Sequence, residues 1–280
     1  MTIASLFLAI QVQAHERFIV PSHTILSGDK AQAVTVTASI SNAIFHPDRP
    51  LGDSTRVTSN DKNIGELKDL FDILEHQVIR PSGKVTNDIR WQAFARQSVA
   101  DVWLKESGTY RIGLIQPDVN MTTFKKPDGS FARLFGKSPK LPTGSTNVVR
   151  RTTSSRVETF VSFNSPDHGA VLPTGVGIEI GGETHPNDLF SGETANFQLF
   201  YRGKPMTIPA KVKIIKAGTR HRNDRNEHTL DVAKDGTFSF TPDSAGFYFL
   251  AAETKIDVKQ PAQVDVKHFS LYLTLEVFPE

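Results

Sequence analysis

Hydrophobic and polar residues alternate along much of the chain. From Val34 to Ile40 every second residue is apolar, and threonine or serine lies between them. The same period of two recurs at 157–163, at 197–201 and, most regularly, at 269–277. A period of two places successive side chains on opposite faces of a β-strand. The pattern therefore predicts many strands, each with one buried face.

Short turn sequences separate these strands. Pro-Ser-Gly at 81–83, Pro-Asp-Gly at 127–129 and Lys-Asp-Gly at 234–236 each place glycine where the chain must reverse with a positive φ. Many short strands joined by such turns are typical of sandwiches rather than of α/β folds. We expect an all-β protein.

Three segments depart from the alternation. Apolar residues at helical spacing between Ile64 and Leu74 predict a short helix that begins near Asn63. Residues 118–156 are rich in Lys, Gly, Pro, Ser and Thr, which predicts a long loop. Leu-Pro-Thr-Gly at 172–175 marks a boundary. We therefore expect one domain over 15–172 and a second over 173–280.

The first residues have the features of a targeting segment. An apolar run covers 3–10, and Val12-Gln13-Ala14 has the small-x-Ala form that precedes a signal peptidase cut. No basic residue precedes the run, so a first core strand is the alternative interpretation. Cleavage after Ala14 would leave residues 1–14 as a signal peptide and His15 as the first residue of the mature protein.

Composition excludes several classes of function. Of the 280 residues, 32 are basic and 30 acidic, and the scattered charges give little support to nucleic-acid binding. No stretch is long and apolar enough for stable membrane insertion. The chain has no cysteine, which excludes disulfides and thiolate ligands. Any metal site must use nitrogen and oxygen ligands.

Several sequence blocks, taken in order, resemble a known family. The blocks are Ala14–Ser22 (Ala-His-Glu-Arg-Phe-Ile-Val-Pro-Ser), Glu106–Ile112, Glu183–Glu193 and Asp235–Pro242. In this order they are similar to the periplasmic proteins of DUF4198, a family related to the substrate-capturing components of nickel and cobalt uptake systems. The resemblance covers nearly the whole mature chain.

The resemblance implies a fold, a location and partners. It implies two Ig-like or transthyretin-like β-sandwich domains, secretion into the periplasm, and a metal-uptake transporter or outer-membrane receptor as partner. It implies no known reaction, so no enzymatic activity is expected. One departure is that no histidine stands at the third mature position, where a square-planar amino-terminal copper or nickel site would need it.

His15 is the leading candidate ligand. At a mature terminus, its α-amino nitrogen and its Nδ1 form one bidentate chelate, and both are available as neutral donors near neutral pH. Such a nitrogen site suits Ni, Co or Cu, and the Irving–Williams order favours Cu(II). The expected cofactor is therefore a transition metal ion.

The chelate needs further ligands from elsewhere in the chain. His46 follows a predicted strand in a loop, where loops from one sandwich end converge. The other candidates are His23, His168 and His185. For each internal histidine the alternative is an exposed or hydrogen-bonded surface residue. His221 and His228 lie in a charged loop at a separation that fits no chelate spacing.

Three functions are compatible with these features. The first is capture of a divalent transition metal, or a metal complex, for uptake or transfer. The second is a mononuclear copper enzyme with an N-terminal histidine chelate, which needs an open coordination position. The third is an envelope interaction module that binds no metal. Hydrolase and nucleotide-binding motifs such as His-Glu-x-x-His, Gly-x-Ser-x-Gly and the Walker loop are absent from the sequence.

Overall fold

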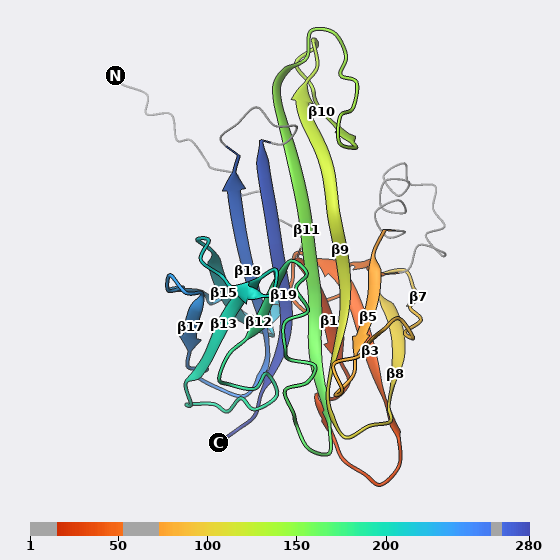
Figure 1. Cartoon of the computed structure of the whole chain (residues 1–280), viewed down its shortest axis with the longest axis vertical. Helices are drawn as coiled ribbons and strands as arrows, with labels where there is room; N and C mark the ends of the chain where they lie inside the picture. The colour runs from red at the N-terminus through yellow and green to blue at the C-terminus, as the bar shows by residue number, and fades with distance from the viewer. Residues whose placement is uncertain (1–15, 53–72, 259–264) are drawn as a thin grey trace.

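The computed structural model describes residues 16–52, 73–258 and 265–280, and these residues are almost entirely β (Figure 1). A single 3₁₀ turn, η1 (Thr219–His221), interrupts the strands of the described ranges. The all-β class and the Ig-like sandwich architecture predicted above are confirmed. The helix predicted near Asn63, the segment 1–14 and His15 lie outside the described residues.

The strands form three sheets. The first contains β1 (Glu16–Pro21), β3 (Gln32–Ser41), β4 (Arg49–Pro50), β7 (Gln92–Ala93) and β8 (Ser98–Leu104). The second and largest contains β2 (Ile25–Leu26), β5 (Glu75–Ile79), β6 (Val85–Thr86), β9 (Gly108–Lys125), β10 (Phe131–Phe135), β11 (Thr146–Phe163), β15 (Lys211–Lys216), β16 (Glu227–Leu230), β18 (Gly246–Asp257) and β19 (Val266–Val277). The third contains β12 (Ile178–Gly181), β13 (Ala195–Tyr201), β14 (Lys204–Pro205) and β17 (Thr237–Phe240).

The large sheet is the common layer of two sandwiches. The first sheet packs on its β5–β9–β11 side and encloses one apolar core, which includes Val36, Leu104, Ile112 and Val161. The third sheet packs against β15, β18 and β19 and encloses a second core. That core includes Ile180, Phe197, Leu250 and Leu271. Full burial of one such side chain contributes about 1.5–3 kcal/mol, so these two cores dominate the free energy of folding.

One parallel strand pair joins the two halves of the large sheet. β11 lies beside β19 in parallel from Arg151 opposite Val266 to Thr159 opposite Thr274. The other long pairs of this sheet, such as β9 with β11 and β18 with β19, are antiparallel. Strands from both sides of the expected boundary at 172 and 173 therefore share one hydrogen-bonded layer.

A small third cluster of apolar side chains fixes β1 to the strands β15 and β18. Phe18 of β1 and Ile44 pack with Ile215 and Phe249, and all four are almost fully buried. Phe18 also meets the ring of Phe45 edge-on at 5.5 Å. The loop that follows β3 is thereby held against β15 and β18.

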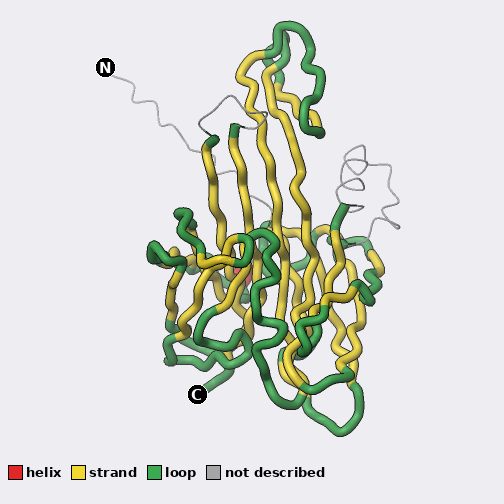
Figure 2. Tube along the Cα trace, in the orientation of Figure 1, coloured by secondary structure: helices red, strands yellow, loops and turns green. Residues whose placement is uncertain are grey.

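The prediction of a long loop over 118–156 was wrong. β9 continues to Lys125, β10 occupies Phe131–Phe135, and β11 begins at Thr146. Figure 2 shows these strands running beyond the body of the molecule to a loop at their far end. Most positions of this ribbon are exposed or half-buried on both faces. An apolar–polar alternation marks only strands with one buried face, so the ribbon lacked that signal.

Candidate functional site

Two histidines from distant parts of the sequence meet at one end of the small third cluster. His46 ends the turn after β3, where its backbone N–H donates to the backbone carbonyl of Ala43 at 3.0 Å. His221 ends η1 in the connection between β15 and β16. Their ring centroids are 6.0 Å apart and the ring planes make an angle of 73°. His46 was among the predicted ligands, whereas His221 had been set aside.

Aromatic packing sets the position of His46. The preceding residue, Phe45, has a left-handed backbone conformation with φ 60°. Its ring contacts Phe18, Phe247 and Phe249 edge-on at 5.5–6.4 Å. A bulky residue with positive φ is unusual and persists only where its surroundings hold it. Here the aromatic cluster holds it, and His46 is presented beside η1.

The surroundings of His46 favour the neutral form of its imidazole. Burial lowers its pKa below 6.5, and the neighbouring Arg220 and His221 lower it further. A neutral imidazole has a free nitrogen lone pair, so it can bind a metal without first losing a proton. Two imidazoles bound to one metal at about 2 Å have ring centroids roughly 4.5–6.4 Å apart, depending on the angle at the metal. The 6.0 Å between the centroids of His46 and His221 lies toward the wide-angle end of that range.

The first described residue lies beside both loops. Glu16 pairs with Ser41 at the end of β3, just before the His46 turn. Its carboxylate is nearly buried and accepts hydrogen bonds from Arg225 at 2.7 and 2.8 Å. Lys213 adds an ion pair at 3.4 Å. Because Arg225 and His221 belong to the same connection, Glu16 ties the start of β1 to the segment that carries His221.

His185 lies in a different place and has no free nitrogen. Its Nε2 lies 2.8 Å from the Asp167 carbonyl and 3.0 Å from Thr109 Oγ1. Its Nδ1 accepts the backbone N–H of Asn187 at 3.1 Å, which assigns the proton to Nε2. Burial lowers its pKa. Metal ligation by His185 would require breaking one of these hydrogen bonds.

The structure does not bring His168 or His23 to the His46–His221 pair. His168 is exposed and meets the ring of His185 edge-on at 5.1 Å. His23 is exposed, with Nδ1 3.2 Å from Ser22 Oγ. Within the described ranges no group of three or more His, Cys, Asp or Glu residues is arranged to hold a metal ion. His15, the leading candidate, precedes the first described residue.

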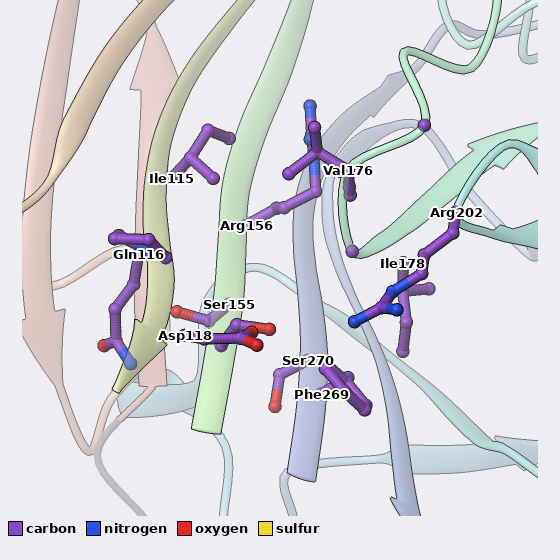
Figure 3. Close-up of a pocket in the computed structure, with 14 residues that line it drawn as sticks. Ile115, Gln116, Asp118, Ser155, Arg156, Val176, Ile178, Arg202, Phe269 and Ser270 are labelled. Atoms are coloured by element: carbon purple, nitrogen blue, oxygen red, sulfur yellow. Dashed lines mark hydrogen bonds between the residues drawn. The ribbon is translucent and has the colours of Figure 1, made fainter. Parts of the chain in front are cut away.

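A pocket lies beside β9, β11 and β19 (Figure 3). It encloses about 260 Å³ between strands of the large sheet and the loop before β12. Arg202 reaches into it from the β13–β14 turn, with Asp118 and Ser155 on the opposite wall. Arg202 also stacks on Tyr201 at 5.3 Å. The pocket is open to solvent and no predicted ligand lines it.

Behind this pocket a fully buried charge network crosses between the sandwiches. Arg156 Nη2 donates to Glu158 Oε1 at 2.6 Å, and Arg111 Nη2 donates to Glu179 Oε1 at 3.3 Å. All four side chains are at most 1% exposed. Burial alone would raise the pKa of Glu158, but Arg156 and Arg111 outweigh it and lower that pKa. The two positive and two negative charges compensate one another. Because Arg111 lies on β9 and Glu179 on β12, the network links the two sandwiches.

Within the described residues no helix is long and apolar enough to cross a membrane.

Comparison with solved structures gives only distant likeness. A trypsin-activated α2-macroglobulin from Escherichia coli is 11% identical with a TM-score of 0.21; 93% of this chain is covered but only 23% of that one. The tandem V-type regions of the chitin-binding protein VCBP3 are 9% identical, with a TM-score of 0.20 and coverage of 92% and 98%. The teleost fish polymeric Ig receptor ectodomain is 9% identical, with a TM-score of 0.20 and coverage of 94% and 98%.

Comparison with families gives a clear assignment. No curated protein matches this chain. The family model described as "Domain of unknown function (DUF4198)" matches residues 12–256, which is most of the sequence. The chain belongs to the DUF4198 family.

Proposed function

We propose that this protein is an exported periplasmic metal-binding protein that captures a divalent transition-metal ion, or a small metal complex, for uptake or transfer. The metal would be copper, nickel or cobalt, because imidazole and amine nitrogens suit these ions. Its partner would be a metal-uptake transporter or an outer-membrane receptor. The proposed ligands are His46, His221 and a mature-terminal His15.

The observation that carries the proposal is the approach of His46 and His221. The centroids of the two imidazole rings lie 6.0 Å apart, and the ring planes meet edge-on at 73°. The lowered pKa of His46 favours the neutral form that a metal requires. Two imidazoles alone make a weak site, so a third donor group is needed.

We propose that residue 15, which precedes β1, supplies that third donor group. His15 directly precedes Glu16, and Glu16 is bound by Arg225 of the connection that carries His221. An α-amino group with its own imidazole would add two nitrogens, which gives four with His46 and His221. Four nitrogen ligands are a suitable set for Cu(II) or Ni(II).

The test is isothermal titration of Cu(II), Ni(II), Co(II) and Zn(II) into protein that begins at His15. We expect binding of one ion, and we expect His46→Ala and His221→Ala each to weaken it by at least about tenfold, since each removes one ligand. One extra residue before His15 should weaken metal binding as well, because the α-nitrogen of His15 is then part of a peptide bond and no longer a free amine.

His228→Ala is the matched control, because His228 is an exposed histidine of the neighbouring strand β16. It should bind as the unaltered protein does. Unchanged affinity in both His46→Ala and His221→Ala would refute the ligand set. No binding of any of the four ions would refute metal capture and leave the interaction module.

A further inference from the structure

The end of the β9–β11 ribbon carries an excess of positive charge. Between Lys125 and Lys140 there are five basic residues and one acid, Asp128. Asp128 is engaged in its own turn, where its Oδ1 accepts the N–H and the hydroxyl of Ser130. The basic side chains at 126, 137 and 140 are exposed. The tip, defined here as residues 125–140, is therefore strongly cationic.

The same tip exposes two aromatic rings. Phe131 and Phe135 are 75% and 52% exposed, and they share one face of β10 because they are four residues apart in a strand. The ammonium group of Lys125 lies 5.1 Å from the centre of the Phe131 ring. In contrast, Phe124 is 2% exposed and pairs across the strands with Ala132. The buried ring of Phe124 lies just before the tip, whereas the tip itself presents exposed aromatic rings beside cations.

The ribbon carries this face away from the rest of the molecule. β9 and β11 extend past the other described strands at one end of the long axis, and β10 lies at that end (Figure 1). A flat surface could therefore contact the tip without touching either sandwich.

We propose that this tip docks on an anionic lipid surface. Aromatic rings beside lysine and arginine are the composition of segments that lie at a membrane–water interface. Each cation near an anionic surface strengthens binding by about fivefold, so several together give measurable attachment. A stable protein complex buries about 1,000 Å² or more with close shape complementarity, and a narrow ribbon tip offers little area for that. A lipid surface requires no matching shape.

The test is co-sedimentation of the whole protein with vesicles. Vesicles of phosphatidylcholine with phosphatidylglycerol should bind it at low salt, and pure phosphatidylcholine vesicles should not. Replacing Lys126, Lys137 and Lys140 together by glutamine should weaken binding by about a hundredfold, from about fivefold for each cation. Phe131→Ser with Phe135→Ser should also weaken it, because the rings no longer enter the interface.

Matched controls distinguish the effect of the tip from the effect of total charge and from that of exposed aromatic rings elsewhere. Lys30, Lys204 and Lys234 are exposed lysines elsewhere, and replacing all three by glutamine should leave most of the binding intact. Trp103 is 59% exposed on β8, and Trp103→Ser should bind normally. The circular dichroism spectra of all variants should match.

Three results would overturn the assignment. Equal binding to neutral and anionic vesicles would exclude the role of the cations. Equal losses in the tip and control lysine variants would show that total charge, not the tip, is responsible. Binding to poly-L-glutamate with none to anionic vesicles would point to an acidic protein partner instead of lipid.

Discussion

At the scale of single residues, His185 shows how a candidate ligand becomes a structural link. Its ring connects Asp167, which follows β11, with Asn187, which precedes β13. Asn187 in turn donates from Nδ2 to the carbonyl of Thr24 and to Ser162. One neutral imidazole therefore joins segments of both sandwiches.

This link predicts a dependence of stability on pH. Burial, as the largest cause, lowers the pKa of His185 below 6.5 in the folded protein. The unfolded chain then binds the proton more readily, so the free energy of unfolding is unaffected above 6.5 and decreases as the pH falls from 6.5 through the folded-state pKa. His185→Gln should remove this part of the pH dependence.

Urea unfolding at pH 7.5 and at pH 5 measures the effect, and His228→Gln serves as an exposed control. The loss of stability between the two pH values should be smaller in His185→Gln than in the control. Identical losses in both variants would contradict the prediction.

The sequence led to His46 as a candidate but not to His221, and the difference has a physical reason. His46 could be proposed because its loop follows a recognisable strand, and β3 was found over Gln32–Ser41. His221 could not be proposed, because only the packing of Phe18 and Ile44 on Ile215 brings its connection to the same place. Spacing in the sequence reports contacts within an element and carries no information on such a distant contact.

At the scale of elements, two turns of the same chemistry differ in their surroundings. Gly129 and Gly236 each follow an aspartate whose Oδ1 accepts hydrogen bonds from the residue after the glycine. Their φ angles are 82° and 85°. A Cβ on Gly129 would have nothing within 4 Å, whereas one on Gly236 would lie 2.7 Å from the carbonyl oxygen of Leu199.

Alanine at these two positions separates backbone strain from steric clash. Both substitutions place a side chain at positive φ, which costs about 1–2 kcal/mol. Gly236→Ala should cost at least about 1 kcal/mol more than Gly129→Ala, because Leu199 must also move. Chemical unfolding of both variants provides the comparison. Equal losses would mean that the β13 backbone moves aside without cost.

Element prediction succeeded where one face of a strand is buried. The alternation at 269–277 was expected to form a strand and does so within β19. The segment 118–156 has the same extended backbone over most of its length but no continuous buried face. Its strands are held mainly by backbone hydrogen bonds between them. Backbone pairing alone requires no alternation of apolar and polar residues, so the sequence carries no sign of it.

At the scale of the whole molecule, the two sandwiches cannot be separated between 172 and 173 without breaking the large sheet. β11 would lose β19 along one edge, and Arg111 and Arg156 would lose Glu179. We expect the fragments 15–172 and 173–280, each produced alone, to lack cooperative thermal unfolding. Circular dichroism melting and gel filtration of each fragment test this.

A single chain of residues 15–280 is the control for that experiment. It should unfold in one transition, since both cores share one sheet. Cooperative unfolding of either fragment near the melting temperature of the 15–280 chain would show that the shared sheet is dispensable.

The parallel pairing of β11 with β19 also determines the order of events as the chain folds. β19 follows β11 far along the chain, so the edge of β11 from Arg151 to Thr159 has no partner until β19 has been synthesised. Contacts between such distant segments form slowly, and an unpaired strand edge can associate with other chains in the meantime. The free edge of β11 is therefore covered only when β19 arrives, so a strand of the second sandwich completes the sheet on which the first sandwich is built.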